Sequence, residues 1–429
     1  MFGFANFLLL ALFAAAVFDL IFALARGGGL RGALHGPWNT PHLLFGQQLA
    51  EWQLQLGRIL FAAGLAAYEI SVVFCNSMAR QNWAWVQGMM SPVLEWLAFL
   101  CFGAKILFGT RYTWRELLAG GALYFIARWV YFNSQNIWWI GIVVAVLAAK
   151  DVPLRRPLQV YFASGCAAMA VVLALHFAGI VAPDLTSERM GALRGTYGYG
   201  HPNTFGGLVF GLVLAYALLR AQKVRWVDCL LVFAVGVFLL VGPASRSAAL
   251  CTLALAVGLV FCRLRAGHSV PRWWPGTCAG MVGLTAAVSY LLPLLVIKVG
   301  PWNNDIGPAW LAKLDSLLTC RISLTWMAYR LLDVKIAGQV FNWPTVDNSF
   351  AFALFQFGPV VAALLGILFA AALLGHAKQG RRVEVCCLFA MLAYAYMEVQ
   401  PFHLTTNPTA LLLCGAVFAQ TSARWQKIE

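Results

Sequence analysis

The stretch "SFAFALFQFGPVVAALLGILFAAALLG" (residues 349–375) contains no charged side chain. About 20 apolar residues are enough for a helix to cross a hydrocarbon core roughly 30 Å thick. Apolar runs recur near residues 4–25, 59–77, 91–109, 116–133, 136–149, 158–181, 203–219, 227–243, 247–262, 276–297, 383–399 and 405–420. We therefore expect an all-α fold, a polytopic helical membrane bundle of about 12 to 13 transmembrane helices.

The composition supports a membrane protein and excludes several other classes. Hydrophobic residues make up 61% of the chain and charged residues only 11%, against roughly 25% charged in an ordinary soluble domain. The net charge of +14 comes from short basic clusters between apolar runs, so it does not predict a nucleic-acid partner. A phosphate-binding P-loop and metal-type pairs of cysteine and histidine are both missing from the sequence. We expect no cofactor and no metal.

Basic clusters predict the orientation of the bundle. They occur in every second loop, as "KDVPLRR" (150–156), "RAQKVR" (220–225), "RLRAGHSVPR" (263–272) and "KQGRR" (378–382). Positively charged loops stay in the cytoplasm, which leaves the loops at 182–202, 243–246, 298–348 and 399–405 outside. The topology of residues 26–58 stays open.

The loop at 298–348 is the longest of the predicted external loops. It lies between the helices expected near 276–297 and 349–375, and its tryptophans and leucines have helical spacing. A connection of this length is uncommon unless it has a function. We expect short amphipathic helices that cover a substrate, within a single polytopic domain spanning residues 1–429.

Arginines in the predicted external loops break the charge pattern. We select Arg194, Arg246 and Arg321 as candidate ligands of a phosphate or diphosphate, because a guanidinium binds such groups in a planar, bidentate manner. The alternative is contact with lipid headgroups. Small residues beside Arg194 and Arg246 would allow a substrate to approach closely.

The motif "HPN" (201–203) marks the start of a predicted helix. Unpaired N–H groups after Pro202 and Asn203 suit a phosphate, although simple capping is the alternative. His201 is a candidate proton-transfer group or an interfacial hydrogen-bonding residue.

Two further segments place polar groups at helix breaks. In "WPTVDNSF" (343–350), Asp347 or Asn348 could cap the following helix, or Asp347 could act as a general base toward a sugar hydroxyl. In "YMEVQPFHLTTNP" (396–408), Glu398, His403 and Asn407 are candidates for lining the same external crevice.

Four of these segments occur in an order that resembles a known enzyme family. "LRGTYGYGHPNTFG" (193–206), "GPASRSAAL" (242–250), "CRISLTWMAYRLL" (320–332) and "DNSFAFALFQFGPV" (347–360) are similar to segments of Wzy-type capsular polysaccharide and O-antigen polymerases, which belong to the O-antigen ligase-polymerase superfamily. The resemblance is strongest from about residue 189 to 360. It implies an inverting, metal-independent membrane glycosyltransferase in the bacterial cytoplasmic membrane, with its active site on the external face.

The resemblance also implies substrates, partners and residue roles. Undecaprenyl-pyrophosphate-linked oligosaccharides would be donor and acceptor, and a flippase and a chain-length regulator would be protein partners. Arg194 and Arg246 match positions that hold the donor pyrophosphate, Arg321 a further basic position and Asp347 the base. Asn203 and Asn348 belong to the same motifs as substrate-binding candidates.

Two alternative functions remain at this point. The related ligases usually have histidine immediately before the asparagine, whereas this chain has Asp347 before Asn348, which favours a polymerase. A transporter such as a flippase for lipid-linked glycans would be expected to have internal repeats with interrupted helices in both halves. The polar motifs here concentrate in the second half.

Overall fold

The computed structural model describes residues 51–110, 112, 114–181, 187–189, 192–296 and 307–418. Seven described helical segments are long and apolar enough to cross a membrane: Trp52–Cys75, Val86–Phe108, Arg155–Phe177, Pro202–Leu219, Arg246–Leu264, Trp274–Leu295 and Pro359–Lys378. The predicted class, a helical membrane protein with several spans, is confirmed. The span expected at 4–25 lies outside the described residues.

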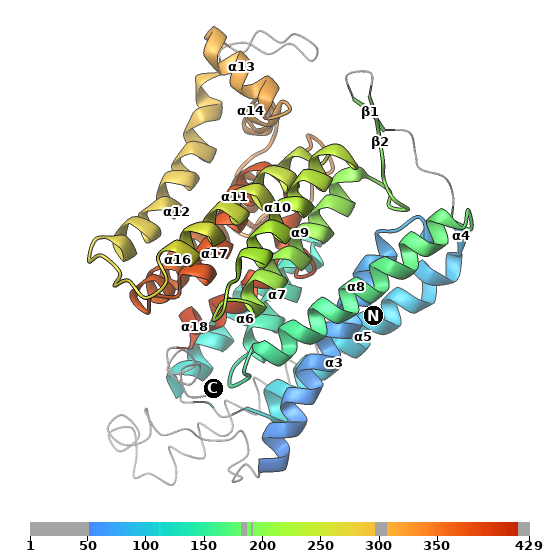
Figure 1. The fold of residues 1–429 in the computed structure, drawn as a ribbon, viewed down its shortest axis with the longest axis vertical. Coiled ribbons are helices and arrows are strands. Elements are labelled where there is room, and N and C mark those ends of the chain that lie inside the picture. Colours follow the sequence, from blue (N-terminus) through green and yellow to red (C-terminus); the bar gives the residue numbers. More distant parts are fainter. Residues whose placement is uncertain are drawn as a thin grey trace. The chain divides into compact units, whose positions relative to one another are not determined.

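The chain divides into two compact units. Figure 1 labels the helices and strands and colours them along the sequence. The first comprises Met1–Ala127, Ile140–Pro183 and Ala410–Glu429, and the second Arg128–Trp139 and Asp184–Thr409. Helices α6 (Trp114–Ser134) and α7 (Ile137–Ala148) and the 3-10 helix η6 (Pro408–Leu413) cross the boundaries. The expectation of one domain over residues 1–429 stays a prediction.

In the first unit, α3 (Glu51–Cys75) packs against α5 (Ser91–Phe108) and α8 (Arg155–Phe177). Glycine allows the close approach of α3 to the end of α5, because a Cβ at Gly57 would lie 3.1 Å from the Cα of Gly109. The unit also contains α4 (Ala79–Asn82), the π-helix η2 (Val86–Met90) and α18 (Cys414–Val417).

The second unit contains the other long helices. Helix α11 (Arg246–Leu264) packs against α9 (Pro202–Leu219), α10 (Trp226–Val241) and α17 (Arg382–Met397). Helix α12 (Trp274–Leu291), which continues as the 3-10 helix η3 (Leu292–Leu295), packs against α16 (Pro359–Lys378). The strands β1 (Ser187–Arg189) and β2 (Ala192–Arg194) form a short antiparallel hairpin in the predicted external loop 182–202.

Two predicted runs differ from single helices. The run at 349–375 divides into α15 (Ser349–Phe352), the π-helix η4 (Ala353–Phe357) and α16, and Gly358, with φ 86°, separates η4 from α16. A Cβ on Gly358 would lie 2.1 Å from the carbonyl oxygen of Ile336, so the break depends on a segment distant in sequence. The run at 405–420 forms η6 and the single turn α18.

The predicted long loop contains two short helices in its described part. These are α13 (Ala309–Leu317) and α14 (Arg321–Leu331), as the spacing of its apolar residues predicts. Asp315 joins them: its carboxylate accepts from the backbone N–H of Ile322 at 2.7 Å and from the Ser323 hydroxyl at 2.8 Å. Residues 298–306 of the loop lie outside the described residues.

The second unit separates its basic loops from its polar motifs. Arg382, at the start of α17, donates to the carbonyl oxygens of Arg265 and His268 and so joins two predicted cytoplasmic loops. At the other ends of α11 and α17, Ser247 donates to Glu398. Helices α11 and α17 are therefore antiparallel neighbours with a basic end and a polar end, as the predicted topology requires.

Candidate functional site

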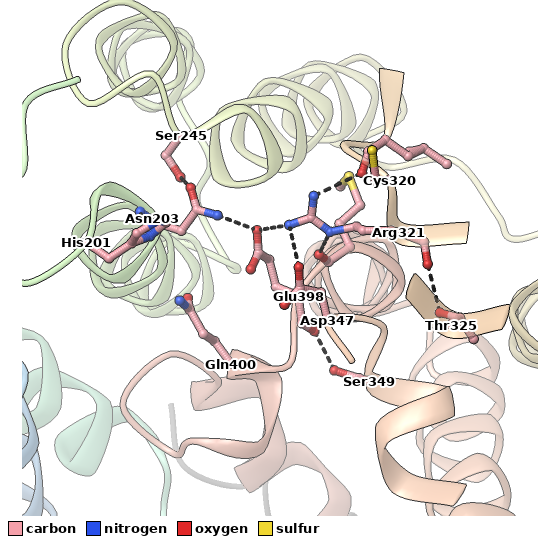
Figure 2. A network of polar contacts seen from close by, with 12 residues as sticks. His201, Asn203, Ser245, Cys320, Arg321, Thr325, Asp347, Ser349, Glu398 and Gln400 are labelled. Atoms are coloured by element: carbon pink, nitrogen blue, oxygen red, sulfur yellow. Dashed lines mark hydrogen bonds and ion pairs between the residues drawn. The ribbon is translucent and has the colours of Figure 1, made fainter. Parts of the chain in front are cut away.

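The site begins where β2 meets the start of α9. Arg194 ends β2 and is buried; its Nη2 donates to Asn203 Oδ1 at 2.8 Å and to the carbonyl oxygen of Ala244 at 3.2 Å. Asn203 is the second residue of α9, and its Nδ2 donates to Glu398 Oε1 at 3.0 Å. Asn203 therefore connects the arginine of one motif to the carboxylate of another, as Figure 2 shows for Asn203 and Glu398.

Aromatic packing holds the "GTYGYG" segment (195–200) in place. Tyr197 stacks on Phe205 of α9 with ring centroids 5.0 Å apart, and Tyr199 lies 5.6 Å from the same ring. Tyr197 also contacts Phe238 of α10 at 5.8 Å. The two tyrosines thus fix the segment that follows Arg194 against α9 and α10.

Glu398 and Arg321 form the centre of the site. Arg321 Nη2 lies 2.5 Å from Glu398 Oε1, and both side chains are buried. The guanidinium also donates to the carbonyl oxygens of Met397 and, at 3.1 Å, Leu318. The ion pair thereby joins the start of α14 in the long loop to the end of α17 (Figure 2).

Asp347 and Asn348 have different roles in the structure. Asn348 caps α15: its Oδ1 accepts from the N–H groups of Phe350 at 2.9 Å and Ala351 at 3.1 Å, and its Nδ2 donates to Ser289 Oγ at 3.1 Å. The Asp347 carboxylate lies 3.9 Å from Arg321 Nη2, and its side chain is 30% exposed. Of the two predicted caps, Asn348 is the cap, and Asp347 is left as the accessible carboxylate.

Close helix packing brings the start of α11 to Asn203. Ser245 Oγ lies 3.5 Å from Asn203 Oδ1. A Cβ at Gly206 would lie 2.3 Å from Ser245 Oγ, and a Cβ at Gly207 would lie 1.9 Å from Gln400 Oε1. A Cβ at Gly206 would also lie 2.6 Å from Ser245 Cβ, so this glycine is required for the close approach of α11, whereas the contact at Gly207 is with the end of a flexible side chain.

His201 and Arg246 are the two exposed members of the predicted set. His201 is the N-cap of α9, and its Nδ1 accepts from the N–H of Asn203 at 3.1 Å. Arg246 is the first residue of α11, directly after Ser245. A helix N-terminus has a positive partial charge, so Arg246 adds a second positive charge to a terminus that already favours an anion.

Burial controls the protonation of two groups that follow the last residue of α17. It raises the pKa of Glu398 to about 7, against the opposing effect of Arg321, and the neighbouring Asp347 raises it further. Burial lowers the pKa of His403 to about 4, where its ring centroid lies 3.9 Å from that of Trp138. His403 is therefore neutral at physiological pH, and Glu398 titrates close to neutrality.

The charges of this cluster nearly balance. When both acids are ionised, Asp347 and Glu398 offset Arg194 and Arg321. Protonation of Glu398 leaves one net positive charge. The arrangement can therefore attract an anionic group through the arginines, and Asp347 is the more exposed of the two acids.

The structure brings most of the predicted residues together. Arg194, Asn203, Arg321 and Asp347 belong to one chain of contacts, whereas the Asn348 amide is occupied by capping and by Ser289. Glu398 was expected only to line the crevice, yet its carboxylate accepts hydrogen bonds from the side chains of Asn203, Arg321 and Ser247. The signal was a carboxylate directly after a long apolar run, where an ionisable group is costly and commonly functional.

Comparison with known proteins identifies no relative of this chain. No protein-family model, no curated protein and no solved structure matches the chain. The function is therefore inferred from the residues of the site and their geometry.

Proposed function

We propose that the chain is a membrane glycosyltransferase that polymerises undecaprenyl-pyrophosphate-linked oligosaccharide units on the external face of the bacterial cytoplasmic membrane. The observation that supports this most is the partly exposed carboxylate of Asp347, 3.9 Å from the buried guanidinium of Arg321. A proton acceptor beside fixed positive charge is what glycosyl transfer from a diphosphate requires. The resemblance of the four motifs to Wzy-type polymerases supports the same reaction.

In the proposed step, one lipid-linked oligosaccharide provides the acceptor hydroxyl. Asp347 takes the hydroxyl proton as the oxygen attacks the anomeric carbon of a second lipid-linked oligosaccharide. The bond between that carbon and the diphosphate oxygen breaks, and its electron pair leaves with the undecaprenyl diphosphate. Attack from the side opposite the leaving group inverts the anomeric configuration, and no nucleotide is needed because the donor is already activated.

The arginines divide into two roles in this proposal. Arg194 and Arg321 are buried and donate to acceptors within the protein, so they supply positive potential and position Asn203 and Asp347. Arg246 is exposed at the start of α11 and is the arginine that we assign to direct, bidentate contact with the diphosphate. Negative charge grows on the diphosphate as it departs, so these arginines stabilise the transition state more than the ground state.

A reconstituted assay tests the proposal. Lipid-linked oligosaccharide is extracted from host cells that lack the protein and is added, without nucleotide, to liposomes that contain the purified chain. We expect a ladder of products at multiples of the repeat unit, with one undecaprenyl diphosphate released for each new linkage.

Other outcomes would contradict the polymerase. Transfer of single units only to a different acceptor would identify a ligase. Movement of the unaltered lipid-linked unit between leaflets, with no diphosphate released, would identify a flippase. Liposomes with an Arg246→Ala variant control for activity of contaminating enzymes.

A further inference from the structure

Two cysteines from different helices are in contact in the second unit. Cys262 is near the end of α11 and Cys386 is near the start of α17, and their Sγ atoms lie 3.6 Å apart. A disulfide needs an S–S distance of about 2.05 Å, so the sulfurs must approach by roughly 1.5 Å.

The helix packing around this pair favours the contact. Gly258 lies one turn before Cys262 on α11, and a Cβ there would be 3.1 Å from Cys386 Sγ. Glycine at this position leaves room for the Cys386 side chain between the helices. Cys262 is buried and Cys386 is partly exposed, so a small reagent can reach the pair from the Cys386 side.

Charged side chains of both signs lie close to the pair, because Glu384 of α17 opposes the effect of Arg382 on Cys262. Arg382 begins α17, interacts electrostatically with Cys262 and donates to the carbonyl oxygens of Arg265 and His268. The thiolate is the reactive form of cysteine. The basic clusters place this end of the helices in the cytoplasm in the predicted topology, where disulfides form mainly as transient, redox-sensing bonds.

We propose that Cys262 and Cys386 are a reversible dithiol modification site, oxidised to a disulfide by hydroperoxides. One thiolate attacks a peroxide oxygen, which breaks the O–O bond, releases water or an alcohol after protonation, and leaves a sulfenic acid. The second thiol then attacks that sulfur and expels water. In total, two thiols and one hydroperoxide give one disulfide, one water and one alcohol, or two waters when the oxidant is hydrogen peroxide; a dithiol reductant reverses the change.

The disulfide would join the two helices that hold the polar site at their opposite ends. Ser247 is on the first turn of α11 and donates to Glu398, which directly follows α17. A covalent bond between Cys262 and Cys386 would restrict sliding or separation of these helices. An effect of oxidation on polymer synthesis rests on the proposed function, whereas formation of the bond does not.

Thiol counting tests the site without any activity assay. Purified protein is treated with hydrogen peroxide, denatured, and labelled with a polyethylene glycol maleimide, which shifts its mobility once per remaining thiol. Of the 11 cysteines, the wild type is expected to lose one reactive pair and to regain it after dithiothreitol. In the Cys262→Ser and Cys386→Ser variants, hydrogen peroxide should not remove a pair of reactive thiols. In the control Cys387→Ser, the same treatment should still remove the pair.

Peptide mass spectrometry identifies the partners. The expected product is a reducible cross-link between the peptides that contain Cys262 and Cys386, lighter by two hydrogen atoms than the two peptides together. A cross-link from either residue to Cys278 or Cys387, a loss of the pair that persists in Cys262→Ser, or full retention of the pair would overturn the proposal. Sulfenic-acid labelling of the exposed Cys320 in the same sample confirms that the oxidant was active, and Cys320 then accounts for one lost thiol beyond the pair.

If the bond forms but polymer synthesis in liposomes is unchanged, the modification site stands and only its proposed effect on the polymerase is lost. If the bond forms and the reduced protein makes no polymer, the proposed function fails independently of the dithiol. The two results therefore separate the two proposals.

Discussion

Replacement of Gly206 by alanine should break the packing that holds the site together. The new Cβ would lie 2.3 Å from Ser245 Oγ, 2.6 Å from Ser245 Cβ and 3.3 Å from Ala248 Cβ. Since the second contact is with a Cβ, a change of the serine rotamer is insufficient, and the start of α11 must move by about 1 Å. Overpacking of this kind costs roughly 1–3 kcal/mol, which outweighs the gain of about 1 kcal/mol from alanine in a helix.

A double-mutant cycle isolates the cause. Ser245→Gly removes both of the closest atoms, so the combination Gly206→Ala/Ser245→Gly should recover most of the lost stability, with an interaction energy of roughly 1–2 kcal/mol. Gly283→Ala is the matched control: a Cβ there meets nothing within 4 Å, so this variant should be unchanged or slightly more stable.

The assay is reversible unfolding of the purified protein in mixed micelles, which gives a free energy for each variant. Gly206→Ala should also reduce polymer synthesis, because Asn203 is one turn earlier on α9 and contacts Ser245. Unfolding free energies of Gly206→Ala and Gly283→Ala that agree within about 0.5 kcal/mol, or additive effects in the cycle, would refute the packing argument.

Three further predictions follow from the site. Asn348→Ala should destabilise the protein by about 1 kcal/mol in the same unfolding assay, and Asn348→Asp should cost much less because aspartate caps as well; equal losses would exclude capping. The pKa of Glu398 is raised from 4.5 to about 7 in the folded protein, so the folded state binds its proton more tightly. Its contribution to the free energy of unfolding is present below pH 4.5 and falls by on the order of 3 kcal/mol as the pH rises to about 7. Glu398→Gln should reduce this pH dependence of the free energy of unfolding; an unchanged pH dependence would assign it to another group. Arg246→Lys should lower the polymerisation rate at least about tenfold at normal protein abundance, because lysine lacks the bidentate fork; full activity would return Arg246 to a lipid-headgroup role.

The sequence predicts well those features that depend on local composition. The helices α9, α11 and α12 follow from apolar runs bounded by polar or turn residues, because a membrane helix satisfies its own backbone hydrogen bonds. The start of α9 at Pro202 follows from proline and a capping residue at a helix entrance. The helices of the long loop follow from the spacing of its leucines and tryptophans.

Other features depend on contacts between distant segments. The break at Gly358 is required by the backbone of Ile336, which no local pattern specifies. The choice of Asn348 over Asp347 as the cap depends on which side chain faces the first turn of α15, and both residue types have the same preference for that position.

Selection of Glu398 also required the structure. Its partners Asn203 and Arg321 are 195 and 77 positions away in the sequence, so the sequence could mark Glu398 as unusual without giving its contacts. His201 shows the same limit, because a histidine before a proline could be a proton-transfer group, and the observed contact of its Nδ1 is a helix cap.

The central claim is that Asp347 accepts the proton of the acceptor hydroxyl, and the rate of polymer growth by Asp347→Asn measures it most directly. Asparagine preserves the volume and leaves the cap at Asn348 intact, so the variant should remain in the membrane at normal abundance. Asp333→Asn, at an exposed position in the same connecting segment, is the matched control and should retain full activity. The account predicts a rate about 10²- to 10⁴-fold lower for Asp347→Asn, with single repeat units accumulating on the lipid carrier. Polymer growth at the wild-type rate by this variant would contradict it.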